Sequence, residues 1–415
     1  MNRSLLAIAA SIALISSGAA FAQTADLSAA IEARDTSALA GLGEGRSREA
    51  ALARGVLAAL HRQDEEAIRN LRTAARSRAL SGELRASAWQ TLSGVYLRQS
   101  RFAEAAEAMS AAAAFGIEQD ATTTAANTQA RIFAEALAEA PRMRSTVAAS
   151  GETAITRDLA QLARADTTIN GVTLDAVLDT GASYSTIAQS VAERLGLRFL
   201  DAHVTVGSAT GDADARLAIA ETLTLAGGVF HDVLFIVLPD QALTFGGGAY
   251  KIEAIVGFPV LVEFGRLEFA INDGAEHLHH RRSSRSGESN MILDGLQPIA
   301  EIEVPAANAT LVMIIDTGAR RTGFSMRAAR DFPALVQGAE TRSTTLGGAG
   351  GEITHDNALA IASIDVNAGG RTVTLQDVRV TENDRNQHGL IGQDLLRSGR
   401  GYVLDFDAMR FELLG

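Results

Sequence analysis

The spacing of apolar residues divides the chain near Pro141. From about Asp26 to Pro141, apolar residues recur at helical spacing in segments rich in Ala, Leu, Arg and Glu. Beyond Pro141, apolar and polar residues alternate in short runs separated by glycine turns, as in "TTINGVTLDAVL" around Asn170-Gly171. Such alternation about an Asn-Gly pair is typical of β-hairpins. The pattern therefore predicts a helical domain followed by an all-β region.

One helical stretch resembles a tetratricopeptide hairpin. In "AWQTLSGVYLRQSRFAEAAEAMSAAAA" the matching positions are Trp89, Leu92, Tyr96, Ala105, Met109 and Ala112. A weaker copy precedes it, with Gly55 at a close-packing position, and a third helix, "TTTAANTQARIFAEALAEA", is expected to act as a cap. A generic helical bundle stays open as the alternative. The helical repeats could bind a protein partner.

The first 22 residues have the order of a cleavable secretory signal. "MNRSLLAIAASIALISSGAAFAQ" places Arg3 before an apolar run and Ala20-Phe21-Ala22 before Gln23. This order predicts cleavage after Ala22 and export, to the periplasm. The apolar run is short and broken by Ser and Gly, so no membrane span is expected after cleavage.

The β region contains an internal repeat. "AVLDTGASYSTI" matches "MIIDTGARRTGF", and "EAIVGFPVL" matches "HGLIGQDLL". Asp179 precedes Gly257 by 78 positions, and Asp316 precedes Gly392 by 76. A lone Asp-Thr-Gly is also what a strand ending in a tight turn looks like. Two copies at near-equal spacing instead favour a paired functional site.

These tandem motifs resemble the aspartic proteases, and more closely their retropepsin-like branch. The resemblance implies a multidomain chain in which an all-α, tetratricopeptide-like domain precedes an all-β, bilobal aspartic protease fold. The expected divisions are a signal peptide at 1–22, a helical domain at 23–145, lobe 1 at 155–273, a linker at 274–291 and lobe 2 at 292–415. Because both lobes lie in one chain, a monomer could form the complete site.

The resemblance also assigns roles to residues. It makes Asp179 and Asp316 a catalytic pair, supported by Thr180, Gly181, Gly257, Thr317, Gly318 and Gly392. Two carboxyl groups held about 3 Å apart share one proton. The ionised member takes a proton from the attacking water while the protonated member donates to the peptide carbonyl. Peptide hydrolysis in this way requires no cofactor and no metal.

Other residues are candidates for substrate binding. The glycine-rich turns "VGSATGD" and "LGGAGGE" resemble the paired flaps of retroviral enzymes. The candidates are Ser183, Gly207, Ser208, Gly211, Arg320, Arg321, Gly347 and Gly348. The arginine pair could instead be a solvated surface pair, or could bind Asp394. Ala182 and Ala319 stand where pepsin-like enzymes place a hydroxyl donor, which predicts a milder working pH than that of pepsin.

Charge and composition exclude several functions. Residues 23–150 carry 15 Arg and 15 acidic residues, whereas residues 151–415 carry 21 basic and 34 acidic residues. This acidic balance argues against nucleic acid as a partner. The absence of cysteine excludes disulfides. His277, His279 and His280 could bind a metal, but a flexible polar linker is the expectation there.

Two alternatives to an active protease stay open. The fold could be a catalytically weak or inactive binding module that uses the helices for protein interaction. The helices could also be an inhibitory segment that covers the cleft.

Overall fold

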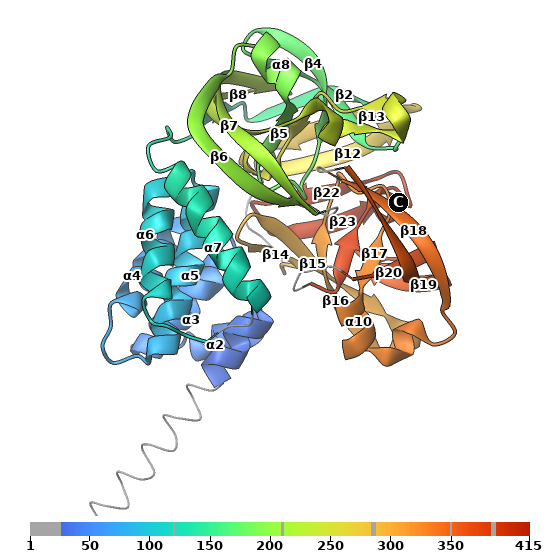
Figure 1. Cartoon of the computed structure of the whole chain (residues 1–415). Coiled ribbons are helices and arrows are strands. Elements are labelled where there is room, and N and C mark those ends of the chain that lie inside the picture. Colours follow the sequence, from blue (N-terminus) through green and yellow to red (C-terminus); the bar gives the residue numbers. More distant parts are fainter. Residues whose placement is uncertain (1–25, 119–120, 209–210, 284–287, 349–350, 383–386) are drawn as a thin grey trace, which may run out of the picture. The chain divides into compact units, whose positions relative to one another are not determined.

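The computed structural model describes residues 26–118, 121–208, 211–283, 288–348, 351–382 and 387–415 (Figure 1). The expected signal peptide lies outside these residues. The chain divides into two compact units. The first contains residues 26–96 and 104–118, and the second contains residues 97–103 and 121–415.

The first unit is helical, as the apolar spacing predicts. After a helix at 26–33 come α2 (Thr36–Leu42), α3 (Arg48–Leu60), α4 (Asp64–Ala75), α5 (Gly82–Arg98) and α6 (Phe102–Ala113). Ser47 begins α3 by accepting a hydrogen bond from the backbone N–H of Ala50. A Cβ on Gly55 would lie 2.8 Å from Leu71 Cγ, so glycine allows α3 and α4 to pack closely. The tetratricopeptide assignment stays a prediction.

The third expected helix, α7 (Ala121–Ala136), belongs to the second unit and not to the helical unit that it was expected to cap. The strand β1 (Arg144–Val147) pairs with β8 (Gly228–Leu238) of lobe 1. The β region therefore begins at Arg144, earlier than the predicted boundary at residue 155. Deleting the predicted helical domain, residues 23–145, would therefore also delete α7 and the first two residues of β1.

Lobe 1 is a β-rich body with short helices. After β1, its elements are β2 (Ser150–Arg157), β3 (Ala163–Ile169), β4 (Val172–Leu178), β5 (Ser185–Ala188), α8 (Gln189–Arg194), β6 (Arg198–Ser208), β7 (Gly211–Leu225), β8, η1 (Asp240–Leu243), β9 (Thr244–Phe245), η2 (Gly246–Gly248), β10 (Tyr250–Lys251), β11 (Ala254–Val256), α9 (Phe258–Leu261), η3 (Val262–Phe264), β12 (Arg266–Asn272) and β13 (Ala275–Arg281). Asn170 and Gly171 both have positive φ, at 47° and 82°, and form the predicted turn between β3 and β4.

Lobe 2 repeats the main strands of lobe 1. Its elements are β14 (Met291–Asp294), β15 (Gln297–Val304), η4 (Pro305–Ala307), β16 (Ala309–Ile315), β17 (Gly323–Ser325), α10 (Met326–Asp331), η5 (Pro333–Val336), β18 (Glu340–Gly348), β19 (Gly351–Ala368), β20 (Arg371–Thr381), β21 (Gly389–Ile391), α11 (Gln393–Leu396), β22 (Gly401–Asp405) and β23 (Arg410–Leu414). The strand order β15-β16-β21-β17-β20-β19-β18 copies β3-β4-β11-β5-β8-β7-β6 of lobe 1. The predicted fold class, a helical region followed by a bilobal all-β region, is therefore confirmed.

The two lobes share strands. β22 and β23 follow lobe 2 in the sequence, but β22 pairs with β12 of lobe 1, from Asp405 opposite Arg266 to Gly401 opposite Ala270. The red strands β22 and β23 accordingly continue the yellow strand β12 in Figure 1. The predicted lobe 2 boundary at 292–415 is thus wrong for its last strands, which join the sheet of lobe 1.

The predicted linker at 274–291 is also wrong in part. Residues 275–281 form β13, which pairs with both β12 and β2. Alternate residues of β13 point inward, so Leu278 and His280 are buried. The His280 ring lies 4.8 Å from the Phe264 ring, and its Nε2 lies 2.7 Å from the Ala226 carbonyl. The polar composition of residues 276–288 favoured a flexible linker, but residues 275–281 lie in a sheet.

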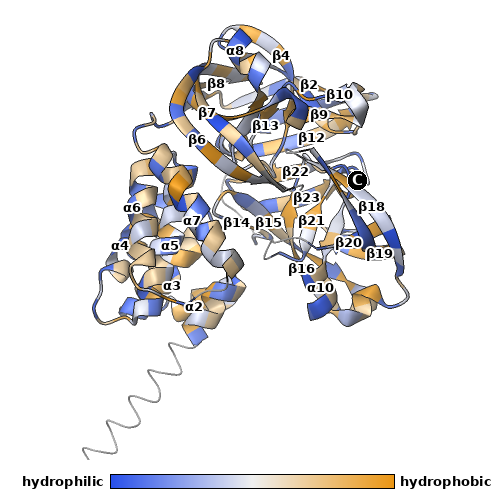
Figure 2. Ribbon diagram, viewed as in Figure 1, coloured by the Kyte–Doolittle hydropathy of each residue, from blue (hydrophilic) through white to orange (hydrophobic). Residues whose placement is uncertain are grey.

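The hydropathy pattern follows this architecture. In Figure 2, hydrophobic and hydrophilic residues alternate along the strands of both lobes, as expected for strands with one buried face. Large buried side chains of the second unit include Phe258, Phe269, Phe406 and Tyr402, each less than 2% exposed. Among the described residues, every helix is too short or too polar to cross a membrane.

Candidate active site

The two Asp-Thr-Gly loops occupy equivalent positions in the two lobes. Asp179 follows β4 and Asp316 follows β16. The Asp179 backbone N–H donates to the Val256 carbonyl at 3.0 Å, and the Asp316 N–H donates to the Ile391 carbonyl at 3.0 Å. β11 and β21 contain the apolar residues of the two apolar-apolar-Gly elements. Their carbonyl groups therefore hold the backbone of each aspartate at the end of β4 or β16.

The two threonines join the loops by crossed hydrogen bonds. The Thr180 N–H donates to Thr317 Oγ1 at 2.9 Å, and the Thr317 N–H donates to Thr180 Oγ1 at 3.1 Å. Each hydroxyl also donates across the lobes, Thr180 to the Ile315 carbonyl at 2.7 Å and Thr317 to the Leu178 carbonyl at 2.8 Å. Both threonines are fully buried, so these bonds lie away from competing water.

The glycines allow the loops to approach each other. A Cβ on Gly181 would collide with the Asp316 carboxyl group, and a Cβ on Gly318 would collide with that of Asp179. Each carboxyl group thus lies against the loop of the opposite lobe.

Gly257 and Gly392 pack against the backbone that follows each Asp-Thr-Gly loop. A Cβ on Gly257 would collide with the Tyr184 backbone, and a Cβ on Gly392 would collide with the Arg321 backbone. The Gly257 N–H donates to Ser185 Oγ at 3.1 Å, and the Gly392 N–H donates to Thr322 Oγ1 at 3.0 Å. These contacts hold the segment that follows each Asp-Thr-Gly.

The two carboxyl groups share one electrostatic environment. Burial, and next the charge of Asp316, raise the pKa of Asp179 to about 8, although the N–H groups of Gly181 and Ala182 work in the opposite direction. These N–H groups lie 2.8 and 3.1 Å from Asp179 Oδ1. Asp179 keeps some exposed surface. At neutral pH the pair therefore retains a proton while remaining accessible to water.

The predicted flap residues lie in matching hairpins. Gly207 pairs with Asp212 and Ser208 with Gly211 in the β6–β7 hairpin. Gly347 pairs with Glu352 and Gly348 with Gly351 in the β18–β19 hairpin.

Phe245 lies beside the lobe 2 hairpin, and the sequence pattern did not predict this. A Cβ on Gly347 would lie 3.6 Å from the Phe245 ring of β9. The Phe245 ring lies 5.8 Å from that of Tyr250. These aromatic residues come from residues 239–253, which have no copy of equal length in lobe 2, so the repeat gave no signal for them.

The residues after each Ala differ between the lobes. Ser183 is partly exposed, and Tyr184 is 7% exposed with its ring 5.1 Å from the Phe133 ring of α7. Arg320 and Arg321 are exposed. Arg321 pairs with Asp377 at 3.3 Å and not with Asp394.

Asp394 has other partners in place of Arg321. Its Oδ1 accepts hydrogen bonds from the Thr322 N–H and hydroxyl, both at 2.7 Å. The predicted option of an Arg321–Asp394 pair is therefore wrong, because Arg321 pairs with Asp377 while Asp394 accepts from Thr322 and from the Leu395 N–H.

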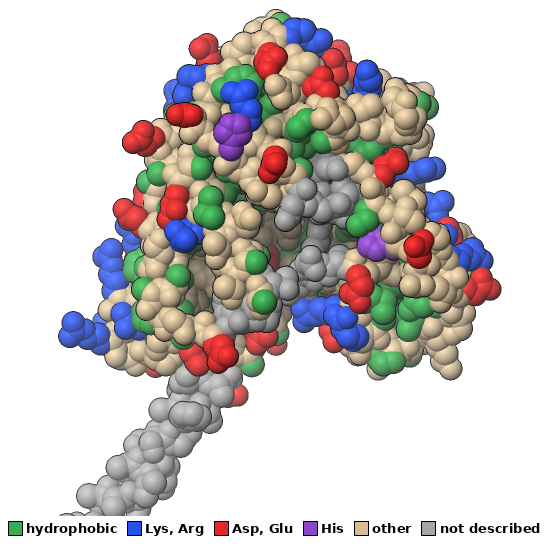
Figure 3. All heavy atoms as spheres, viewed as in Figure 1, with side chains coloured by type: hydrophobic (Ala, Val, Ile, Leu, Met, Phe, Trp, Pro, Cys, Tyr) green, Lys and Arg blue, Asp and Glu red, His purple; other side chains and the backbone are tan. Residues whose placement is uncertain are grey.

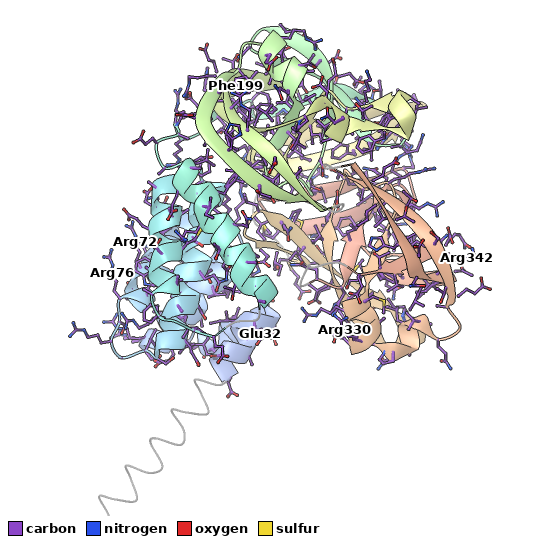
Figure 4. The ribbon with its side chains drawn as sticks, viewed as in Figure 1. Glu32, Arg72, Arg76, Phe199, Arg330 and Arg342 are labelled. Carbon is purple, nitrogen blue, oxygen red and sulfur yellow. The ribbon has the colours of Figure 1, made fainter. Side chains whose placement is uncertain are left out.

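Charged side chains of both signs lie on the surface of the lobes (Figure 3). On the face in Figure 3, acidic and basic side chains are interspersed on both lobes. Arg342, labelled at the outer edge of lobe 2 in Figure 4, contacts Glu340 at 2.7 Å. Within the part of the chain that the structure describes, no three His, Cys, Asp or Glu residues form a group that could hold a metal ion.

Comparison with known proteins gives a family match for lobe 1. Residues 165–260 match the family model described as aspartyl protease. A crystal structure of a retropepsin-like aspartic protease from Rickettsia conorii is similar to 34% of this chain and 96% of that chain, at 17% identity and a TM-score of 0.22. No curated protein matches the chain significantly. The family match confirms, over residues 165–260, the resemblance to aspartic proteases that the tandem motifs predict.

Proposed function

We propose that this protein is an exported aspartic endopeptidase. Its substrates would be proteins or peptides, and its nucleophile would be a water molecule activated by Asp179 and Asp316. The observation that carries the proposal is the reciprocal placement of the two carboxyl groups. Each lies against the glycine of the other loop, and crossed threonine hydrogen bonds fix both loops.

The reaction uses the shared proton of the pair. The ionised carboxyl removes a proton from water as its oxygen attacks the peptide carbonyl carbon, and the other carboxyl donates its proton to the carbonyl oxygen. The resulting tetrahedral diol collapses when the newly protonated carboxyl gives its proton to the leaving amine nitrogen and the ionised carboxyl takes a proton from one diol hydroxyl, so that the C=O bond re-forms as the C–N bond breaks. Both protonation steps belong to the pair and not to either aspartate alone.

The surroundings support this chemistry. The raised pKa of Asp179 keeps one proton on the pair at mild pH. The absence of a hydroxyl at Ala182 and Ala319 removes a donor that would favour ionisation of both groups. Both hairpins, β6–β7 and β18–β19, supply glycine backbone that could hydrogen-bond an extended peptide. Export is supported by the signal-like order of residues 1–22.

A peptide library is the test. The chain starting at Gln23 would be incubated with the library from acidic to neutral pH, with and without pepstatin, and the products identified by mass spectrometry. The proposal expects cleavage that pepstatin blocks, with an optimum above the strongly acidic range of about pH 2. Absence of cleavage at every pH would contradict it and would favour the alternative, an inactive protease fold that acts as a binding module.

A further inference from the structure

The position after each supporting glycine differs in chemistry between the lobes. In lobe 1 it is Phe258, which is fully buried with its ring 5.6 Å from that of Phe406. In lobe 2 it is Gln393, which is 2% exposed. A buried amide must find hydrogen-bond partners or lose stability. The hydrogen-bond partners of Gln393 therefore show what this amide holds in place in lobe 2.

The Gln393 amide connects the catalytic loop of lobe 2 to lobe 1. Its Nε2 donates to the Thr317 carbonyl at 2.7 Å. Its Oε1 accepts from Arg157 NH1 at 2.9 Å. An arginine can only donate, so Arg157 determines which end of the amide faces it and leaves the NH2 group for Thr317.

Thr317 passes this restraint on to a catalytic carboxyl group. The Thr317 carbonyl and the Gly318 N–H belong to one rigid, planar peptide unit. The Gly318 N–H donates to Asp316 Oδ1 at 3.0 Å. Fixing the carbonyl end of this peptide through Gln393 therefore also fixes the N–H that orients the Asp316 carboxyl group.

Arg157 itself is firmly held. It comes from the end of β2, and its Nε donates to Glu276 Oε2 of β13 at 2.9 Å. NH2 makes a second contact with Glu276, and NH1 also donates to the Gln161 carbonyl at 3.0 Å. The side chains of Arg157 and Glu276 are only 11% and 10% exposed. Burial lowers the pKa of Arg157, but Glu276 and the neighbouring Tyr402 together outweigh burial and raise this pKa above its usual value.

We propose that Gln393, and through it Arg157 of the opposite lobe, are positioning residues that set the orientation of Asp316. The restraint runs from Glu276 through Arg157 and Gln393 to the Thr317–Gly318 peptide. Lobe 1 lacks the same restraint, because Phe258 has no polar side-chain atom. The proposal rests on the proposed peptidase activity for its kinetic consequences, but its geometric consequence can be measured without turnover.

The kinetic test uses Gln393→Met, which keeps the volume and removes both hydrogen bonds. We expect kcat to fall about 10- to 100-fold, since small misplacement of a catalytic group costs about this much. KM should change less than about threefold, because Gln393 contacts the loop and not the substrate. The acidic limb of the pH–rate profile should move to higher pH, since Asp316 would lose the orientation of an N–H donor.

Two further variants test the direction of the hydrogen bonds. Gln393→Glu can accept from Arg157 but, as a carboxylate, cannot donate to the Thr317 carbonyl, so it should not restore kcat. Arg157→Lys keeps a charged donor and should be less damaging than Arg157→Met. Full activity in Gln393→Glu, or equal losses in the two Arg157 variants, would contradict the proposed positioning.

A matched control separates positioning from general stability. Asn290, which directly precedes β14, makes a similar amide pair with Phe411 of β23, donating to its carbonyl at 2.8 Å and accepting from its N–H at 2.7 Å. Asn290→Leu should lower the melting temperature while leaving kcat within about twofold. If Asn290→Leu lowers kcat as much as Gln393→Met, the loss reflects stability, and the proposal fails.

Amide hydrogen exchange tests the geometry directly. In Gln393→Met, the Gly318 amide should exchange about 10-fold faster, with a smaller change at Gly181 of the lobe 1 loop. Unchanged Gly318 exchange would overturn the positioning proposal whether or not the protein hydrolyses peptides. Faster exchange in a chain that never cleaves a peptide would support the positioning and contradict the proposed function.

Discussion

The two lobes have the same backbone plan but different support around their aspartates. Both use the same strand order, a threonine that crosses to the other loop and a glycine behind the loop. Lobe 1 surrounds its loop with apolar groups such as Tyr184 and Phe258, whereas lobe 2 uses polar groups such as Gln393 and Asp394. The backbone contacts that create the carboxyl pair are thus kept twice, while the side chains that support them have diverged.

The largest effect is expected from replacing the loop glycines that the two lobes share. Gly181→Ala and Gly318→Ala each place a methyl group against the carboxyl group of the opposite lobe. We expect each variant to lose at least about 100-fold in kcat/KM, because the carboxyl groups must separate. Steady-state hydrolysis measures the loss. Near-normal activity in either variant would contradict the close approach of the loops.

The next comparison concerns the residues that follow Ala in each lobe. Tyr184→Ala removes a buried ring that packs on Phe133 and should cost about 3–5 kcal/mol of unfolding free energy. Arg321→Ala removes an exposed ion pair with Asp377 and should cost less than about 1 kcal/mol. Urea denaturation measures both. Equal costs would show that the lobes do not differ here as described.

Arg321 is also a candidate for substrate recognition. If it recognises an acidic side chain of the substrate, Arg321→Ala should change the cleavage profile of a peptide library without changing stability. An unchanged profile would remove Arg321 from substrate recognition.

The threonines test what the lobes share. Thr180→Val and Thr317→Val each delete a buried hydroxyl that accepts one backbone N–H and donates to one carbonyl. Each variant should lose about 2–4 kcal/mol of unfolding free energy, since two backbone groups lose their partner. The two losses should agree within about 1 kcal/mol, because the crossed bonds are equivalent. A large loss in only one variant would mean that one lobe carries the junction.

The smallest effect concerns pH. The folded state raises the pKa of Asp179 to about 8, so the folded protein holds a proton that the unfolded chain releases at ordinary aspartate pKa. Stability is therefore greatest below about pH 4 for this group and is lost as the pH rises toward 8. Asp179→Asn should melt a few degrees higher than the original chain at pH 8 and close to it at pH 4. The reverse order at pH 8 would contradict the raised pKa.

Much of the site was predictable because its signals are local or repeated. The Asn170-Gly171 turn and the two Asp-Thr-Gly loops are each recognised from a few consecutive residues. The β13 strand was missed because His277 and His279 made its outward face look like a linker. The contact between Arg157 and Gln393 joins positions 236 residues apart, and no local pattern indicates such a pairing. The only available signal was the mismatch of Phe258 with Gln393 in the aligned repeat.

The central claim is that each lobe supplies one of two interdependent carboxyl groups. The most direct measurement is hydrolysis of a single cleaved peptide by Asp179→Asn and by Asp316→Asn, at matched folded concentrations verified by circular dichroism. The account predicts that each variant loses at least about a thousandfold in kcat while keeping its fold, since one carboxyl cannot act as both acid and base. Undiminished hydrolysis by either folded variant would contradict it.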